Sequence, residues 1–191
     1  MKNKAVFLDR DGVINKEVNF LYKWEQFEFL PRTDEAIRRL NKSGYLVIVI
    51  TNQPVVARDM CSEDELKDIH AKMKKELEKK NAKIDAVYYC PHHPDKGFPE
   101  ENKAYKIECE CRKPKLGLFL QAKKDFNIDF VKSYMIGDTT KDIFAGKSIG
   151  CKTILVKTGY AGTDKRYNIS PDFIVEDLYD AAELILSRQY I

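Results

Sequence analysis

The chain has 191 residues, of which 43% are hydrophobic, 33 are basic and 30 are acidic, so its formal net charge is +3. This length predicts a single domain over residues 1–191 with a substantial core. The balanced charge disfavours a nucleic-acid-binding protein, and no apolar segment approaches the roughly 20 residues that cross a bilayer. Because no secretory signal is recognisable, we expect a cytoplasmic protein with reduced, metal-bound or buried cysteines.

Apolar, strand-like runs alternate with amphipathic segments along the chain. The run at 45–51 is β-branched and apolar on both faces, which is typical of a parallel strand covered on both sides. Asp34 and the capping-box sequence at Ser62 precede residues with helical spacing, so we expect both to cap helices. The alternation predicts a three-layer α/β fold with a mainly parallel sheet. The expected strands are 5–8, 45–51, 84–89, 133–136, 153–156 and 172–175, and further helical patterns lie at 116–123, 138–142 and 178–186.

Polar and charged residues collect at the carboxyl ends of the predicted strands, where sheets of this class bind ligands. Asp9 and Asp11 follow the first strand, Thr51 ends the second, Lys113 comes after the third, and Asp138 follows the fourth. Carboxylates suit a hard cation such as Mg²⁺, which prefers oxygen ligands. We therefore expect Asp9, Asp11 and Asp138 to bind Mg²⁺.

This set of residues fits phosphoryl transfer to an aspartate. Asp9 is the expected nucleophile that forms an aspartyl-phosphate, and Asp11 the expected acid that protonates the leaving oxygen and later activates water. Thr51 and Lys113 would hold the nonbridging phosphate oxygens. Arg10 is expected to point away from the site. Each motif alone has an ordinary structural explanation, such as a turn or a helix cap, but their conjunction at one sheet edge favours the catalytic interpretation.

At these positions the chain resembles the haloacid dehalogenase-like (HAD) hydrolases over nearly its whole length. Residues 9–13 are similar to the first motif of that family, Thr51 to the second, Lys113 to the third, and Asp138 with Asp142 to the fourth. The resemblance implies a Mg²⁺-dependent phosphatase with a Rossmann-like core and no large cap domain. In such a site Asp142 would lie behind the metal ligands.

A long irregular segment, about 90–114, carries three cysteines and two histidines. Cys90, His92, Cys109 and Cys111 would make a closed tetrahedral zinc site, which is the structural type. The alternative is a buried Cys90, exposed histidines and a reduced Cys109 and Cys111. Because the polar residues between the two halves of the motif could not order themselves by burial, we favour a structural Zn²⁺, with His92 preferred over the histidine that follows it.

The zinc motif with its adjoining Arg-Lys-Pro sequence is similar to that of the D-glycero-D-manno-heptose-1,7-bisphosphate 7-phosphatases. This resemblance implies removal of the 7-phosphate of a heptose bisphosphate. The product would lead to nucleotide-activated heptose for lipopolysaccharide core or other surface glycans. We expect the substrate to contact Asn52, Gln53, Arg58, Arg112 and Lys113.

The chain also departs from those phosphatases. Pro54 and Val55 replace a Ser-Gly pair, and Thr139 replaces a lysine that is often a substrate contact, so the exact sugar and anomer stay open. The alternative enzyme is a histidinol-phosphate phosphatase, which shares the zinc motif with a shorter spacer. A zinc-dependent nucleic-acid-binding module is the alternative from another class. We expect a monomer that binds a small sugar phosphate, no nucleic acid and no membrane.

Overall fold

The computed structural model describes residues 2–95 and 101–187. Regular elements follow one another in the strand–helix alternation that the sequence predicts. The strands are β1 (Ala5–Leu8), β2 (Leu46–Asn52), β3 (Ala86–Cys90), β4 (Tyr134–Gly137), β5 (Lys152–Val156) and β6 (Phe173–Val175). The helices are α1 (Thr33–Lys42), α2 (Glu63–Glu78), α3 (Gly117–Phe126), α4 (Thr140–Ser148) and α5 (Leu178–Ser187), with short 3₁₀ helices η1 (Trp24–Gln26) and η2 (Phe130–Lys132).

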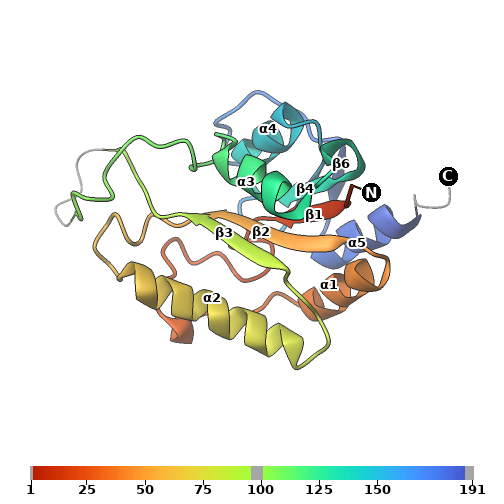
Figure 1. The fold of residues 1–191 in the computed structure, drawn as a ribbon, viewed down its shortest axis with the longest axis horizontal. Helices are drawn as coiled ribbons and strands as arrows, with labels where there is room; N and C mark the ends of the chain where they lie inside the picture. The colour runs from red at the N-terminus through yellow and green to blue at the C-terminus, as the bar shows by residue number, and fades with distance from the viewer. Residues whose placement is uncertain (1, 96–100, 188–191) are drawn as a thin grey trace.

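The six strands form one sheet in the order β3-β2-β1-β4-β5-β6, and every neighbouring pair is parallel (Figure 1). All six predicted strands are present, with bounds that differ from the prediction by at most two residues. β1 lies between β2 and β4, so the order of strands reverses beside its carboxyl end. In open parallel sheets this reversal is where ligands bind.

Helices cover both faces of the sheet and make three layers (Figure 1). On one face α1, α2 and α5 pack on the sheet through residues such as Ile37 and Met73. On the other face α3 and α4 pack on it, for example through Phe119. Because side chains alternate along a strand, Val6 belongs to the first of these clusters and Phe7 to the second. The predicted α/β fold class is confirmed.

Of the two predicted helix caps, Ser62 and Asp34, the first is confirmed and the second is wrong. Ser62 caps α2 as predicted, because its hydroxyl accepts a hydrogen bond from the N–H of Glu65 at 3.2 Å. Asp34 does not cap α1, which begins one residue earlier at Thr33, after Arg32 in the left-handed region with φ 59°. Asp34 instead lies in the first turn, where a negative charge favours the helix dipole.

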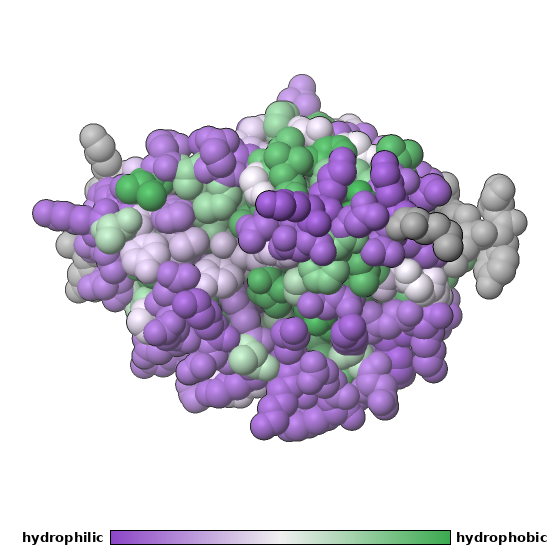
Figure 2. Space-filling view, in the orientation of Figure 1, coloured by the Kyte–Doolittle hydropathy of each residue, from purple (hydrophilic) through white to green (hydrophobic). Residues whose placement is uncertain are grey.

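The exposed face of α2 is covered by charged residues. Figure 2 shows hydrophilic residues along the lower edge of the molecule, where Figure 1 places this helix. Its ion pairs, such as Lys67 with Asp64 at 3.0 Å, lie in solvent and contribute little to stability. The buried side chains of the helix, Leu66 and Met73 among them, therefore hold it to the sheet. No helix among residues 2–95 and 101–187 has both the length and the apolar character to span a membrane.

Two long connections leave the carboxyl edge of the sheet. The first, 9–32 after β1, contains no regular element longer than η1. The second follows β3 and continues past the end of that strand toward the left of Figure 1. No large cap domain interrupts the described part of the chain, as predicted. The predicted zinc segment of 90–114 includes residues 96–100, which lie outside the described residues.

Candidate active site

A cavity of about 120 Å³ opens at the carboxyl edge of the sheet, beside the reversal of strand order. The predicted residues Asp9, Asp11, Thr51, Asp138 and Arg112 all line it. They come from four segments that are remote in sequence, and parallel strands bring those segments to one edge. The structure therefore brings these predicted residues together around one small space.

Asp9 follows β1 directly and is only 6% exposed. Its Oδ1 accepts the backbone N–H of Arg10 at 2.7 Å, and its Oδ2 lies 2.9 Å from Nζ of Lys113. Burial alone would raise the pKa of Asp9, but Lys113 and Lys141 hold it below its usual value. Asp9 is therefore a carboxylate at neutral pH, which is the form that a nucleophile requires.

Lys113 lies behind Asp9, with its side chain fully buried. Its Nζ is 2.7 Å from Oδ1 of Asp142, in addition to the contact with Asp9. Burial would lower the pKa of Lys113, but the two carboxylates keep it above its usual value. Lys113 is not among the residues that line the cavity, so in this structure it acts on the cavity through Asp9. Its predicted contact with a phosphate oxygen stays a prediction.

Asn52 holds the backbone that carries this lysine. Its side-chain oxygen accepts the N–H of Lys113 at 2.9 Å, and its side-chain nitrogen donates to the carbonyl of the same residue at 3.0 Å. Both ends of the amide are thus engaged by one residue. The expected substrate contact from Asn52 stays a prediction, while the structure gives the residue a positioning contact that sequence reasoning missed.

Three buried carboxylates, those of Asp9, Asp138 and Asp142, place oxygen atoms within 4.8 Å of one another. Burial and the charges of Asp142 and Asp9 raise the pKa of Asp138 to about 8, because the three carboxylates share one buried space. A side chain at Gly12 or Gly159 would collide with the Asp138 carboxylate. Carboxylate oxygens gathered in this way fit Mg²⁺. The cluster differs from the predicted ligand set because it contains Asp142 and lacks the Asp11 carboxylate.

Asp142 connects this cluster to helix α4. Its Oδ2 accepts the N–H of Thr139, the residue before the helix, at 3.2 Å, and the Thr139 hydroxyl donates to the same oxygen. Its Oδ1 faces Lys113. The residue is fully buried and absent from the cavity lining, in keeping with its predicted place behind the ligands.

The carboxylate of Asp11 is not part of that cluster and is held by donors from the protein. Nη2 of Arg10 lies 2.9 Å from both of its oxygens, and Nε2 of Gln53 donates to Oδ2 at 2.7 Å. Arg10 is absent from the cavity lining, as expected of a side chain that points away, but its guanidinium contacts Asp11 and Gln53. The negative charge of Asp11 compensates for the full burial of this guanidinium.

Gln53 was expected to contact the substrate, and it does line the cavity. Its side chain is nevertheless saturated by protein groups: it also donates to the Thr51 hydroxyl at 3.0 Å and accepts from Arg10 at 3.0 Å. Gln53 therefore orients two predicted catalytic residues. Its predicted substrate contact stays a prediction.

Two further lining residues were missed from the sequence. Lys141 adds a positive charge to a cavity rich in carboxylates, and the N–H of Tyr160 donates to Oδ2 of Asp138 at 2.8 Å. The available signals were the place of Lys141 inside the fourth motif and the glycine before Tyr160. Arg58 is absent from the lining of this cavity, and its guanidinium lies 4.2 Å from the centre of the Phe20 ring.

A second cavity of about 420 Å³ adjoins the first. The two share Glu17, Asn19 and Tyr160 as lining residues. Burial and the nearby charge of Asp11 raise the pKa of Glu17. These three common residues place the two cavities side by side at the same edge of the sheet.

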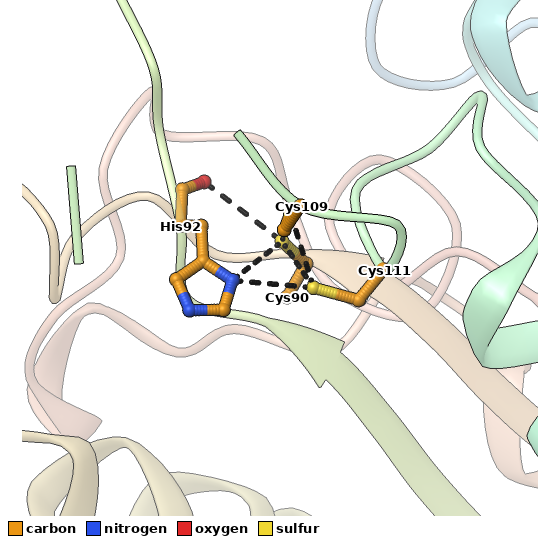
Figure 3. Close-up of side chains that lie close together, drawn as sticks. All are labelled: Cys90, His92, Cys109 and Cys111. Atoms are coloured by element: carbon orange, nitrogen blue, oxygen red, sulfur yellow. Dashed lines mark hydrogen bonds between the residues drawn. The ribbon is translucent and has the colours of Figure 1, made fainter. Parts of the chain in front are cut away.

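The predicted zinc ligands converge on one point (Figure 3). Sγ of Cys111 lies 3.1 Å from Sγ of Cys90, 3.2 Å from Sγ of Cys109 and 3.2 Å from Nδ1 of His92. Three sulfurs and one imidazole nitrogen at these separations are the donor set of a closed structural zinc site. His92 contributes to the cluster rather than His93, as predicted, so the residues fit Zn²⁺.

The segment that carries the cluster is tied to the rest of the fold. The hydroxyls of Tyr89 and Tyr105 both donate to the Glu63 carboxylate at 2.7 Å, which joins the segment to the start of α2. Nη1 of Arg112 donates to the carbonyl of His92 at 3.0 Å. These contacts fix the backbone from which Arg112 reaches the cavity.

Known proteins that are similar to this chain agree with a phosphatase site. A family model described as HAD-hydrolase-like matches residues 110–181. The chain is 39% identical to the D-glycero-beta-D-manno-heptose-1,7-bisphosphate 7-phosphatase of Pasteurella multocida (strain Pm70), over 95% of this chain and 96% of that one. It is 38% identical to the D-glycero-alpha-D-manno-heptose-1,7-bisphosphate 7-phosphatase of Photorhabdus laumondii, over 96% of this chain and 97% of that one.

Among solved structures, the D,D-heptose 1.7-bisphosphate phosphatase from B. bronchiseptica, complexed with magnesium and phosphate, aligns with a TM-score of 0.84. It is 31% identical in sequence, and the alignment covers 97% of this chain and 99% of that one. Fold, cavity and near full-length relatives agree. The chain belongs to the heptose-1,7-bisphosphate phosphatase family of the HAD-like hydrolases.

Proposed function

We propose that the chain hydrolyses the 7-phosphate of D-glycero-D-manno-heptose 1,7-bisphosphate. The names of its near full-length relatives support this substrate. The observation that carries the chemistry is the ionised, buried Asp9 beside a cavity of about 120 Å³, with Lys113 behind it. In this role the product would lead to nucleotide-activated heptose for lipopolysaccharide core or other surface glycans.

The first half of the reaction uses the acid and the nucleophile of the cavity. Arg112 and Lys141 supply the positive charge that attracts a phosphate, and the Thr51 hydroxyl can donate to one of its oxygens. An Asp9 oxygen attacks phosphorus, an aspartyl-phosphate forms, and the bond from phosphorus to the sugar oxygen breaks. Asp11 gives its proton to that leaving oxygen.

The second half regenerates the enzyme. Asp11, now a carboxylate, takes a proton from a water molecule whose oxygen attacks phosphorus, and the bond between phosphorus and Asp9 breaks. Asp9 and Asp138 are the side chains that would hold Mg²⁺, with Asp11 as the third predicted ligand. When bound, Mg²⁺ neutralises negative charge on the phosphate and on the carboxylates around it.

The two adjoining cavities suggest how the sugar lies. The reacting phosphate fits the smaller one, and the remainder of the substrate extends into the larger one past Glu17 and Asn19. The carboxylate of Glu17 can accept hydrogen bonds from sugar hydroxyls. Because one relative is named for the beta anomer and another for the alpha anomer, the preferred anomer must be measured.

We also infer that the enzyme acts in the cytoplasm as a monomer. The zinc ligands Cys90, Cys109 and Cys111 are unpaired thiols, and a reducing compartment keeps thiols in that state. Size-exclusion chromatography with light scattering tests the monomer, and a stable dimer at micromolar concentration would contradict it.

A substrate panel tests the proposed function. kcat/KM is measured with Mg²⁺ for both anomers of the heptose bisphosphate, for hexose bisphosphates and for histidinol phosphate. We expect the highest value for one heptose anomer, with inorganic phosphate released from position 7. A higher kcat/KM for histidinol phosphate would reject the proposal.

The nucleophile is tested separately by Asp9→Asn, which should abolish turnover and leave the fold intact. Asp68→Asn, on the exposed side of α2, is the matched control and should keep normal activity. Substantial phosphatase activity in the Asp9→Asn enzyme would exclude the aspartyl-phosphate mechanism.

A further inference from the structure

His70 is a buried polar residue that the proposed reaction does not use. It lies on the inner face of α2, is 5% exposed, and is 60 residues away in sequence from its partner Arg10. Its Nε2 is 3.1 Å from Nη1 of Arg10. The other buried positions of α2 are apolar, namely Leu66, Ile69, Met73 and Leu77. A histidine here therefore differs from what core packing alone selects.

The chemistry of the pair fixes its hydrogen-bonding roles. A guanidinium can only donate, so Nε2 of His70 accepts and carries no proton. The neutral ring then has its proton on Nδ1, and that atom has no hydrogen-bond partner among the described residues. The contact with Arg10 is thus the one hydrogen bond of the ring among the described residues, which points to holding Arg10 as its role.

Arg10 is in turn one of three residues that hold Asp11; the other two are Asn15, which donates to Oδ1 at 2.8 Å, and Gln53, which donates to Oδ2 at 2.7 Å. Its Nε donates to Oδ1 of Asp11 at 3.1 Å, and its Nη2 lies 2.9 Å from both oxygens. Gln53 accepts from the same Nη2 at 3.0 Å. The planar guanidinium is thus fixed at three points by Asp11, Gln53 and His70. Removing the third point frees Nη1, so that the guanidinium plane can tilt and loosen its contacts with the Asp11 carboxylate, which Asn15 and Gln53 alone then hold.

We propose that His70 is a positioning residue for the reaction: through Arg10 it fixes the orientation of the Asp11 carboxylate toward the leaving oxygen of the substrate. The inference rests on the proposed phosphatase function and adds a residue from α2 to it. The ring of Tyr89, whose centre lies 5.3 Å from that of His70, supports the imidazole from β3. Helix α2 is thereby connected to the acid and base of the site.

The test exploits the leaving group, because proton donation matters for a sugar alkoxide and hardly matters for p-nitrophenolate. His70→Leu removes the acceptor, whereas His70→Gln keeps an acceptor at the place of Nε2. Met73→Ala, one turn further along the same buried face, is the control for destabilisation. kcat is measured for each enzyme on the heptose bisphosphate and on p-nitrophenyl phosphate, at a temperature at which unfolding curves show all of them folded.

We expect His70→Leu to lower kcat on the sugar phosphate roughly tenfold or more and to leave kcat on p-nitrophenyl phosphate within about threefold. His70→Gln should restore most of the loss, and Met73→Ala should change both substrates alike. In an Asp11→Asn background His70→Leu should have no further effect on the sugar phosphate. Should His70→Leu not fold, His70→Asn serves in its place, because its side chain is too short to reach Arg10.

If His70→Leu lowers kcat equally on both substrates, or lowers it as much in the Asp11→Asn background, the proposed role of His70 is overturned and the proposed phosphatase function is not. If the unmodified enzyme turns over neither substrate, the proposed function itself is overturned. The two failures are therefore distinguishable in one set of measurements.

Discussion

Replacement of Lys113 by methionine tests how the buried charges of the site are balanced. The side chain of Lys113 is fully buried, and its Nζ lies 2.9 Å from Asp9 and 2.7 Å from Asp142. At an effective dielectric constant of about 20, each contact is worth about 6 kcal/mol of Coulomb energy. The desolvation of three charges offsets most of that gain. Lys113→Met keeps the volume of the side chain and leaves two buried carboxylates without their cation.

We expect this change to lower the free energy of unfolding by about 3–5 kcal/mol, the usual result of removing one partner of a buried ion pair. For a domain of this size, with a urea m-value of about 2 kcal/mol/M, the unfolding midpoint should fall by roughly 2 M urea. The measurement is urea unfolding followed by circular dichroism at pH 7, without added Mg²⁺. Phosphatase activity should be lost as well.

Lys115→Met is the matched control, because Lys115 is an exposed lysine that pairs with Glu108 and Glu110 at the surface. It should unfold like the unmodified protein. The double variant Lys113→Met/Asp142→Asn should be less destabilised than the sum of the single changes, since one of the unbalanced charges is gone. A midpoint for Lys113→Met close to that of Lys115→Met would refute the reasoning.

Three further outcomes are expected. Removal of Zn²⁺ with a chelator under reducing conditions should lower the thermal unfolding midpoint and the activity together, and so should Cys109→Ser. The reason is that metal binding and ordering of the segment are coupled. Absence of stoichiometric zinc in metal analysis would contradict this. Ser62→Ala should cost about 1 kcal/mol in urea unfolding, since it removes the cap of α2; an unchanged midpoint would show that the cap is dispensable. Burial, with the charge of Arg10, depresses the pKa of His70 well below 6.5, so the unfolded chain takes up a proton first as the pH falls. Stability should therefore drop by about 1 kcal/mol between pH 7.5 and 5.5 in the unmodified protein and less in His70→Gln, and equal drops would exclude the assignment.

Much of the site could be predicted from the sequence because it depends on order along the chain. Parallel strands place their carboxyl ends at one edge, so Asp9, Thr51 and Asp138 had to lie near one another once the strands were recognised. The clustering of the four predicted zinc ligands was equally predictable, since one residue separates Cys109 from Cys111 and Cys90 ends a strand. Residue type and spacing carry that information by themselves.

Only the tertiary structure decided which way the polar side chains turn. Arg10 pairs with its neighbour Asp11 but also with residues 43 and 60 positions away, Gln53 and His70, and no local pattern encodes such a partner. Asn52 likewise closes on a backbone 61 residues distant. A buried polar group must find its hydrogen bonds wherever the packed elements offer them. The sequence by itself thus determined the fold class, the edge of the sheet and the candidate zinc ligands, whereas packing determined which carboxylates cluster, which residues face the cavity and which hold the others in place.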